Sequence, residues 1–194
     1  MLADLQPRRV IVSGTDADLA AVLVRLLRRD RLDVEVAYLP RGKSVAAQVW
    51  GLPRDAVELA LDGAATPVPL VRDDSGGVLV GEASVRDLRG ECYCDETLVL
   101  RGLGQRLLVR PTHGGIAVRA SRTGRPPDGH TRAVSPRAPA GRGSAVGRAV
   151  QLGGAAFTPV LDGVAHPRPV TRWAWYRHTS DWLFVAPQAA GRSW

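Results

Sequence analysis

Hydrophobic positions follow two different patterns along the chain. In the first part, β-branched runs at residues 9–13 and 34–39 are typical of buried strands. Between them, one apolar stripe of helical spacing predicts an amphipathic helix: Leu19, Val22, Leu23, Leu26 and Leu27. A short helical segment at 45–50 follows the second strand. Residues 1–62 are therefore expected to form a βαβα lobe with parallel strands.

After Gly63 the helical stripe disappears, and short β-like runs alternate with turn-forming residues. Residues 63–194 are therefore expected to form an antiparallel β-sandwich-like domain, so that the fold class is α/β plus all-β. Thr179, Ser180 and Asp181 indicate a hairpin before a final strand at 182–186. We expect the core of this domain to hold most of a C-terminal aromatic cluster: Trp173, Trp175, Tyr176, Trp182, Phe184 and Trp194.

The positive charge is concentrated in one segment. The chain has 194 residues, a net charge of +7 and a pI of about 10.6. Residues 119–148 hold seven arginines against one acidic residue, Asp128. The middle of this segment, at about 122–145, is rich in Gly, Pro, Ser, Arg and Ala, which predicts a mobile basic loop. It contains no aromatic residue on which a base could stack, which argues against nucleic acid as a partner.

Several protein classes are excluded by composition. The longest stretch without charge, residues 149–161, is too short to span a bilayer, and no secretory leader is visible. A cytoplasmic location is therefore expected, with Cys92 and Cys94 as reduced thiols on one strand face. The cysteines and histidines lack metal-ligand spacing, so no metal site is expected. Twenty-five arginines against the single lysine, Lys43, indicate a GC-rich, actinobacterial type of coding bias.

Three places could carry chemistry. The turn at residues 14–18 between strand and helix could bind phosphate or Mg²⁺, or it could simply cap the helix. Lys43, in the turn at 40–44, could contact phosphate or be ordinary solvated surface. Asp162 could face a cleft or be a β-turn residue. The Leu-Asp-Gly at 161–163 also resembles an intramembrane zinc protease motif, but that interpretation is rejected because His-Glu-x-x-His and membrane spans are missing.

The first 53 residues together resemble the diacylglycerol/sphingosine-type lipid kinases, which are relatives of the NAD kinases. That family has a strand, Gly-Gly-Asp-Gly-Thr, a helix, a strand ending in Pro-x-Gly-Thr-x-Asn-Asp-x-Ala, and a helix closing on Leu-Gly-Ile-Pro. The corresponding segments here are Gly-Thr-Asp-Ala-Asp at 14–18, Pro-Arg-Gly-Lys-Ser-Val-Ala at 40–46 and Trp-Gly-Leu-Pro at 50–53. The resemblance implies a two-lobed fold in which Asp162 takes the place of the Asp of an Asp-Gly-Glu in the cleft.

Departures from the family pattern fall on the residues that would serve catalysis. Thr15 and Ala17 replace glycines of the phosphate loop, and Val164 replaces the acid of Asp-Gly-Glu. Lys43 stands at the Thr of the second loop, whose Asn-Asp is lost as well. Only residues 1–8 precede the first strand, so the lobe is expected to be a truncated half of a kinase-like nucleotide domain.

We therefore expect a pseudoenzyme: a non-catalytic, lipid-kinase-like protein that binds an anionic small molecule, a lipid or a protein partner in an inter-lobe cleft. The candidate catalytic residues are Asp16 and Asp162. The candidate ligand-binding residues are Gly14, Thr15, Asp16, Arg41, Gly42 and Lys43. No cofactor is expected.

Alternatives remain open at this point. One is an active lipid kinase that uses MgATP at a divergent or partner-completed nucleotide site. Another is an adaptor that binds an anionic membrane or nucleic acid through the basic loop. An open strand at the edge of a truncated sheet would also permit a homodimer.

Overall fold

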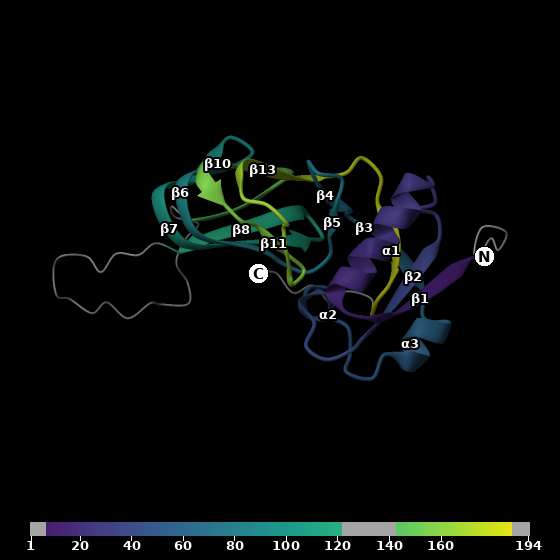
Figure 1. Ribbon diagram of the computed structural model, residues 1–194. Helices are drawn as coiled ribbons and strands as arrows, with labels where there is room; N and C mark the ends of the chain where they lie inside the picture. The colour runs from purple at the N-terminus through teal and green to yellow at the C-terminus, as the bar shows by residue number, and fades with distance from the viewer. Residues whose placement is uncertain (1–6, 122–142, 188–194) are drawn as a thin grey trace.

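The computed structural model describes residues 7–121 and 143–187. The described chain forms two lobes: a small mixed sheet covered by helices, and a large antiparallel sheet (Figure 1). Both the α/β and the all-β parts of the expected fold class are confirmed. The expected basic loop lies mostly outside the described residues, although Ser144 and Ala145, which were assigned to it, belong to a strand.

The first half of the α/β lobe follows the sequence pattern. Strands β1 (Arg9–Gly14) and β2 (Glu35–Pro40) are parallel, and α1 (Asp16–Arg28) crosses between them. Thr15 and Asp18 form a capping box at the start of α1. Of its apolar stripe, Leu19 and Leu23 are fully buried, and the other members pack partly buried against the same core. Two short helices follow, α2 (Val45–Val49) and α3 (Val57–Asp62).

The small sheet is completed by two strands from residues 63–194, the part of the chain expected to form the β domain. The strand order is β1-β2-β14-β3, with β14 (Trp182–Val185) parallel to β2 and antiparallel to β3 (Ala65–Val68). The expected hairpin at residues 179–181 is wrong, because this turn carries the chain from the large sheet into the small one. A central strand must bury both faces, and Trp182, Phe184 and Val185 supply the apolar side chains for that position.

The C-terminal aromatic residues that the structure describes consequently divide between two cores, and Trp194 lies outside the described residues. Trp182 and Phe184 pack with Trp50 in the α/β lobe. Trp173 and Trp175 pack in the β lobe, as expected. The expectation that most of the cluster fills the β core is therefore wrong for the members on β14. The period of two along a strand assigns residues to a face but does not identify the sheet to which the strand belongs.

The large sheet has the order β5-β4-β13-β10-β6-β7-β8-β9, and every neighbouring pair is antiparallel. Its strands are β4 (Val71–Asp73), β5 (Val78–Leu79), β6 (Ala83–Cys94), β7 (Thr97–Thr112), β8 (Gly115–Ser121), β9 (Ser144–Gly147), β10 (Ala149–Phe157) and β13 (Val170–Arg177). A small hairpin of β11 (Val160–Leu161) and β12 (Val164–Ala165) pairs with the start of β6.

The cysteines lie on β6 as two buried thiols on one face, and neither forms a disulfide. Burial raises the pKa of Cys92 to about 12 and that of Cys94 to about 11. None of the helices in the described residues is long and apolar enough to span a membrane.

Candidate functional site

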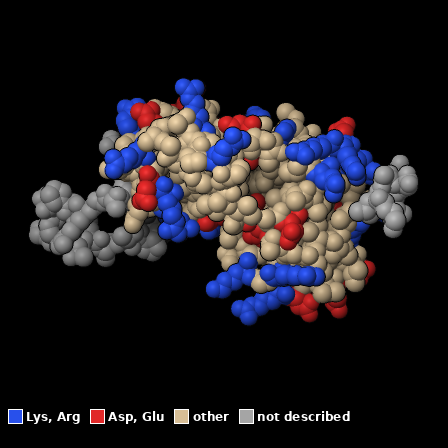
Figure 2. Space-filling model, viewed as in Figure 1, with Lys and Arg blue, Asp and Glu red and all other residues tan. Residues whose placement is uncertain are grey.

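A cleft of about 450 Å³ lies where the two lobes meet. Thr15, Asp16 and Lys43 line it from the α/β lobe, while Glu82 and Asp162 line it from the β lobe. Figure 2 shows acidic side chains gathered around the hollow between the lobes. The fold therefore brings together three candidate residues that lie far apart in the sequence: Asp16, Lys43 and Asp162.

Asp16 is the first residue of α1, and its carboxylate reaches across to the start of α2. Its Oδ1 accepts hydrogen bonds from the Ser44 hydroxyl at 2.5 Å and the Tyr38 hydroxyl at 2.8 Å. Its Oδ2 accepts from the backbone N–H groups of Val45 at 2.8 Å and Ala46 at 3.1 Å. Asp16 thus satisfies orphan donors at the N-terminus of the neighbouring helix, while Thr15 and Asp18 cap its own.

Asp162 holds the linker between β5 and β6. Its Oδ2 accepts from Val80 N–H at 3.0 Å, and its Oδ1 accepts from Gly81 N–H at 2.8 Å and Glu82 N–H at 3.0 Å. Asp162 and Gly163 have φ values of 48° and 86°, which fit the turn expected between β11 and β12. Burial raises the pKa of Asp162 to about 7, against the effect of these three hydrogen bonds, and the nearby charge of Asp16 also raises it.

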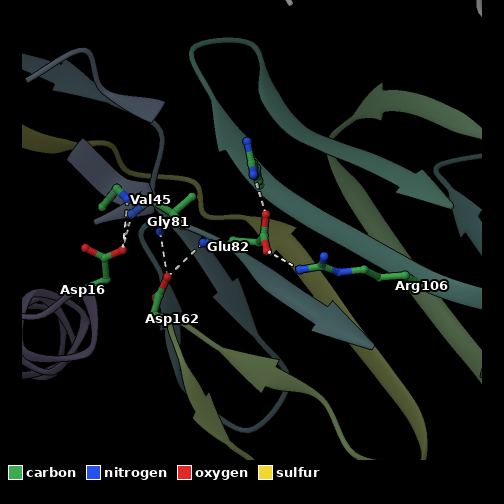
Figure 3. A network of polar contacts seen from close by, with 8 residues as sticks. Asp16, Val45, Gly81, Glu82, Arg106 and Asp162 are labelled. Atoms are coloured by element: carbon green, nitrogen blue, oxygen red, sulfur yellow. Dashed lines mark hydrogen bonds and ion pairs between the residues drawn. The ribbon is translucent and has the colours of Figure 1, made fainter. Parts of the chain in front are cut away.

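Gly81 lies close to both carboxylates. Figure 3 shows Asp162 pointing to Gly81 and Glu82 of this linker, and Asp16 pointing to Val45 at the start of α2. A Cβ on Gly81 would lie 2.8 Å from the Ala46 nitrogen, 3.0 Å from Oδ2 of Asp16 and 3.1 Å from Oδ1 of Asp162. Only a glycine permits this close approach of the two lobes. Asp162 therefore holds the inter-lobe linker by hydrogen bonds, and Asp16, which holds the start of α2, packs against the linker at Gly81.

Lys43 lies at the junction of the cleft and a second hollow of about 400 Å³. This hollow, which we call the Lys43 pocket, is lined by Pro40, Gly42, Lys43, Ser44, Ala47, Gln48, Leu52, Pro53 and Arg54. Its lining contains two cations and no acidic residue, whereas the cleft lining contains Asp16, Glu82 and Asp162. The arrangement of charge makes the Lys43 pocket the more favourable of the two for an anion.

The other candidate ligand-binding residues have different surroundings. Arg41 donates to the Ser13 hydroxyl at 3.2 Å on the exterior, and it lines neither hollow. Gly42 has a φ of 91° in the turn before α2 and lines the Lys43 pocket. Gly14 is packed under Asp18, whose Oδ2 lies 2.5 Å from the position that a Gly14 Cβ would take. Hydrogen bonds from Thr15 hold the pKa of Asp18 below its usual range.

One charged residue that lines the cleft, Glu82, is not indicated by the sequence pattern. The Glu82 carboxylate accepts from Arg110 at 2.6 Å and lies 3.4 Å from Arg106, and its backbone is the one held by Asp162. The even spacing of Arg106 and Arg110 on β7 places both on one face of the strand. That spacing is visible in the sequence, but their partner Glu82 is identified only by strand pairing.

Across the described parts of the chain, no three His, Cys, Asp or Glu side chains are grouped so that they could hold a metal ion. The carboxylate oxygens of Asp16 each accept two hydrogen bonds from the protein itself. Direct coordination of Mg²⁺ by Asp16 would therefore have to displace donors that fold α2.

No protein-family model matches the sequence, and no curated protein is similar enough in sequence to count as a relative. Among solved structures, the fold matches a protein from Bacillus anthracis str. Sterne described as a putative diacylglycerol kinase. The two share 9% sequence identity with a TM-score of 0.66, and the match covers 93% of this chain and 79% of the other. A further match is an NAD kinase from Archaeoglobus fulgidus in complex with ATP, with 10% identity, a TM-score of 0.47, and coverage of 93% and 78%. At 9% sequence identity, the match to the Bacillus anthracis structure shows the fold alone. The chain has the two-lobed diacylglycerol kinase-like fold that its sequence motifs implied.

Proposed function

We propose that this protein is a non-catalytic protein of diacylglycerol kinase-like fold that binds an anionic ligand at Lys43, where the inter-lobe cleft meets the Lys43 pocket. The observation that carries the proposal is that both candidate catalytic residues, Asp16 and Asp162, are occupied by hydrogen bonds within the protein. Asp16 accepts four hydrogen bonds and Asp162 accepts three, all from donors of this chain. Both carboxylates are thereby engaged in holding α2 and the linker.

Asp16 and Asp162 are poorly placed to support phosphoryl transfer. The reaction needs metal ions to neutralise the phosphates and a group that positions the nucleophile. Asp16 has no oxygen without two donors, and Val164, at the place of the family's acid, is an exposed apolar residue. These features support binding without catalysis.

The anionic character of the ligand follows from the charges around Lys43. Lys43 is exposed, and Arg54 shares the Lys43 pocket with it in the absence of any acidic lining residue. A hollow of about 400 Å³ is within the usual range for small-molecule sites. A phosphate-bearing small molecule or lipid headgroup would suit this pocket, because Lys acts as a strong point charge for phosphate.

Calorimetric titration with inorganic pyrophosphate and with ATP tests the proposal. Lys43→Met, which keeps the side-chain length and removes the charge, is expected to weaken binding by about 10- to 100-fold, the equivalent of one charge-assisted hydrogen bond. Lys43→Arg keeps the charge and is expected to retain most of the affinity. Arg89→Ala, at an exposed arginine of β6, serves as the control. Binding that is absent in the wild type, or unchanged in Lys43→Met, would overturn the proposal.

One observation favours a second function, an active ATP-dependent lipid kinase. The raised pKa of Asp162, about 7, is suited to a general base near neutral pH. This candidate predicts transfer of labelled γ-phosphate from MgATP to diacylglycerol, with loss of the transfer in Asp162→Asn. Phosphate transfer by the purified protein would replace the non-catalytic proposal. If the protein binds ATP but transfers no phosphate, the non-catalytic proposal is supported.

A further inference from the structure

The outer side of β1 is an open edge of the small sheet, as Figure 1 shows. No strand within residues 7–121 or 143–187 hydrogen-bonds to that side. With six residues, β1 is also the longest edge strand in the described part of the chain, because β3 and β9 have four residues each and β5 and β12 have two each. The opposite edge, β3, contains Pro67, which cannot donate to another strand.

The ladder with β2 determines which backbone groups of β1 remain available. The Arg8 carbonyl accepts from Glu35 N–H, and the Gly14 carbonyl accepts from Arg41 N–H. In a parallel ladder every second residue points its N–H and C=O to the same neighbour, so Val10 and Val12 also face β2. The N–H and C=O groups of Arg9, Ile11 and Ser13 therefore point outward.

From this pattern we infer that two copies of this chain form a symmetric dimer by antiparallel pairing of their β1 strands, with the twofold axis at Ile11. In this register Ile11 pairs with Ile11 of the second copy, and Arg9 pairs with its Ser13. In this register all three residues with outward-facing groups lie in hydrogen-bonded pairs. A register shifted by two residues would leave only two of the three residues paired. The dimer closes on itself because each copy uses its single open β1 edge.

The side chains along β1 suit this partner. Ile11 is 40% exposed on the edge, and β1 carries neither a lysine nor a proline nor a bulge that would discourage pairing. At the end of α3, Leu61 is 57% exposed. Arg9 ties this helix to β1 by donating to the carbonyl oxygens of Ala60, Leu61 and Gly63. The edge therefore offers apolar surface beside the unpaired backbone groups.

Charge is complementary across the same register. Arg8 lies 3.4 Å from Glu35 but keeps a side chain that is 90% exposed. It would lie opposite Gly14 of the second copy, where the exposed Asp18 covers the backbone. The twofold axis creates this contact twice. Arg9 would lie opposite Ser13, close to the like-charged Arg41. Glu35 compensates the charge of Arg9 through an ion pair of 2.7 Å.

Sedimentation equilibrium of the full chain tests the dimer. The wild type is expected to show twice the mass of one 20.7 kDa chain in the micromolar range. Ile11→Pro removes one outward N–H without touching the β1–β2 ladder, and Ile11→Lys places two like charges at the axis; both are expected to be monomeric. Leu103→Lys, at a 55% exposed position of β7, is the control and is expected to remain dimeric. A monomeric wild type, or a dimer that persists in a folded Ile11→Lys or Ile11→Pro variant, would overturn the inference.

Cross-linking tests the register. Ile11→Cys is expected to be joined to its counterpart by a short bismaleimide, because directly paired Cα atoms lie about 5.5 Å apart. The native thiols are buried and are expected to remain unmodified. Leu103→Cys should give no covalent dimer under the same conditions. A dimer by mass in which Ile11→Cys does not cross-link would reject pairing at the β1 edge.

Discussion

Asp16 and Asp162 act on the fold by the same chemistry, since each carboxylate accepts backbone N–H groups from a segment distant in the sequence. Asp16 holds the start of α2, and Asp162 holds the β5–β6 linker. A buried donor that loses its partner is costly, because it has already given up its hydrogen bond to water. At the scale of single residues, the acids of this site are therefore expected to have large effects on stability.

Asp16→Ala would leave the Ser44 hydroxyl and two backbone N–H groups without their acceptor, while the Tyr38 hydroxyl keeps the Gly14 carbonyl at 3.2 Å. The free energy of unfolding is expected to fall by about 3 kcal/mol in urea titrations followed by circular dichroism. Asp18→Ala removes an exposed capping contact at the same end of α1 and should lower the free energy of unfolding by clearly less. Equal losses for the two variants would contradict the structural role of Asp16.

Asp162 predicts a pH dependence of stability. Its pKa is about 7 in the folded chain against an ordinary value of 3.8, so the folded state binds more protons between these values. Its contribution to stability is therefore largest near pH 4 and falls as the pH rises toward 7, by at most about 1.4 kcal/mol per pH unit. Urea unfolding of the wild type and Asp162→Asn over this range should give a sloping difference curve. A flat difference would show that Asp162 titrates normally.

At the scale of elements, residues of both lobes pack against the linker between β5 and β6. Asp16 and the start of α2 approach Gly81 from the α/β lobe, and Asp162 approaches it from the β11–β12 hairpin. The Glu82 side chain, at the end of this linker, is in turn held by Arg106 and Arg110. A change at Gly81 therefore acts on both lobes at once.

Gly81→Ala is expected to lower the free energy of unfolding by about 1–3 kcal/mol, because the added Cβ meets backbone and carboxylate atoms that cannot move independently. Gly153→Ala, at a position with no heavy atom within 4 Å of the added Cβ, is the matched control and should change little. Chemical denaturation measures both. A Gly81→Ala protein as stable as Gly153→Ala would mean that the linker is not tightly packed at Gly81.

At the scale of the whole molecule, the chain crosses from the β lobe back into the α/β lobe at its end. β14 lies between β2 and β3, so the small sheet has no continuous hydrogen bonding without it. Trp182 and Phe184 also fill the core beneath α1. The α/β lobe is consequently not a unit that residues 1–62 could build alone.

A chain that ends at His178 lacks β14 and is expected to lose the helical circular dichroism signal of the α/β lobe. A peptide of residues 179–187 added in trans is expected to restore part of that signal, which distinguishes a missing strand from general misfolding. A shortened chain that keeps its helical signal and a cooperative melting transition would contradict the central position of β14.

Local patterns were sufficient for much of the fold. The apolar stripe of α1, the β-branched β1 and β2, and the Asp162-Gly163 turn were all readable, because each depends on neighbours within a few residues. The candidate site could be predicted only in part from the sequence. Asp16 and Asp162 were identifiable as candidates, but their hydrogen-bond partners lie about 30 and 80 residues away in the sequence. Glu82 had no local signal at all.

By itself, the sequence determined β1, α1, β2 and α2, the β-rich character of the rest of the chain and the apolar face of α1. It also determined the concentration of positive charge in residues 119–148. The tertiary structure decided that β14 belongs to the small sheet and that Asp16 and Asp162 meet at Gly81. It also left the outer edge of β1 open within the described residues. The physical reason is that strand pairing and carboxylate desolvation depend on contacts between distant segments, which local periodicity does not encode.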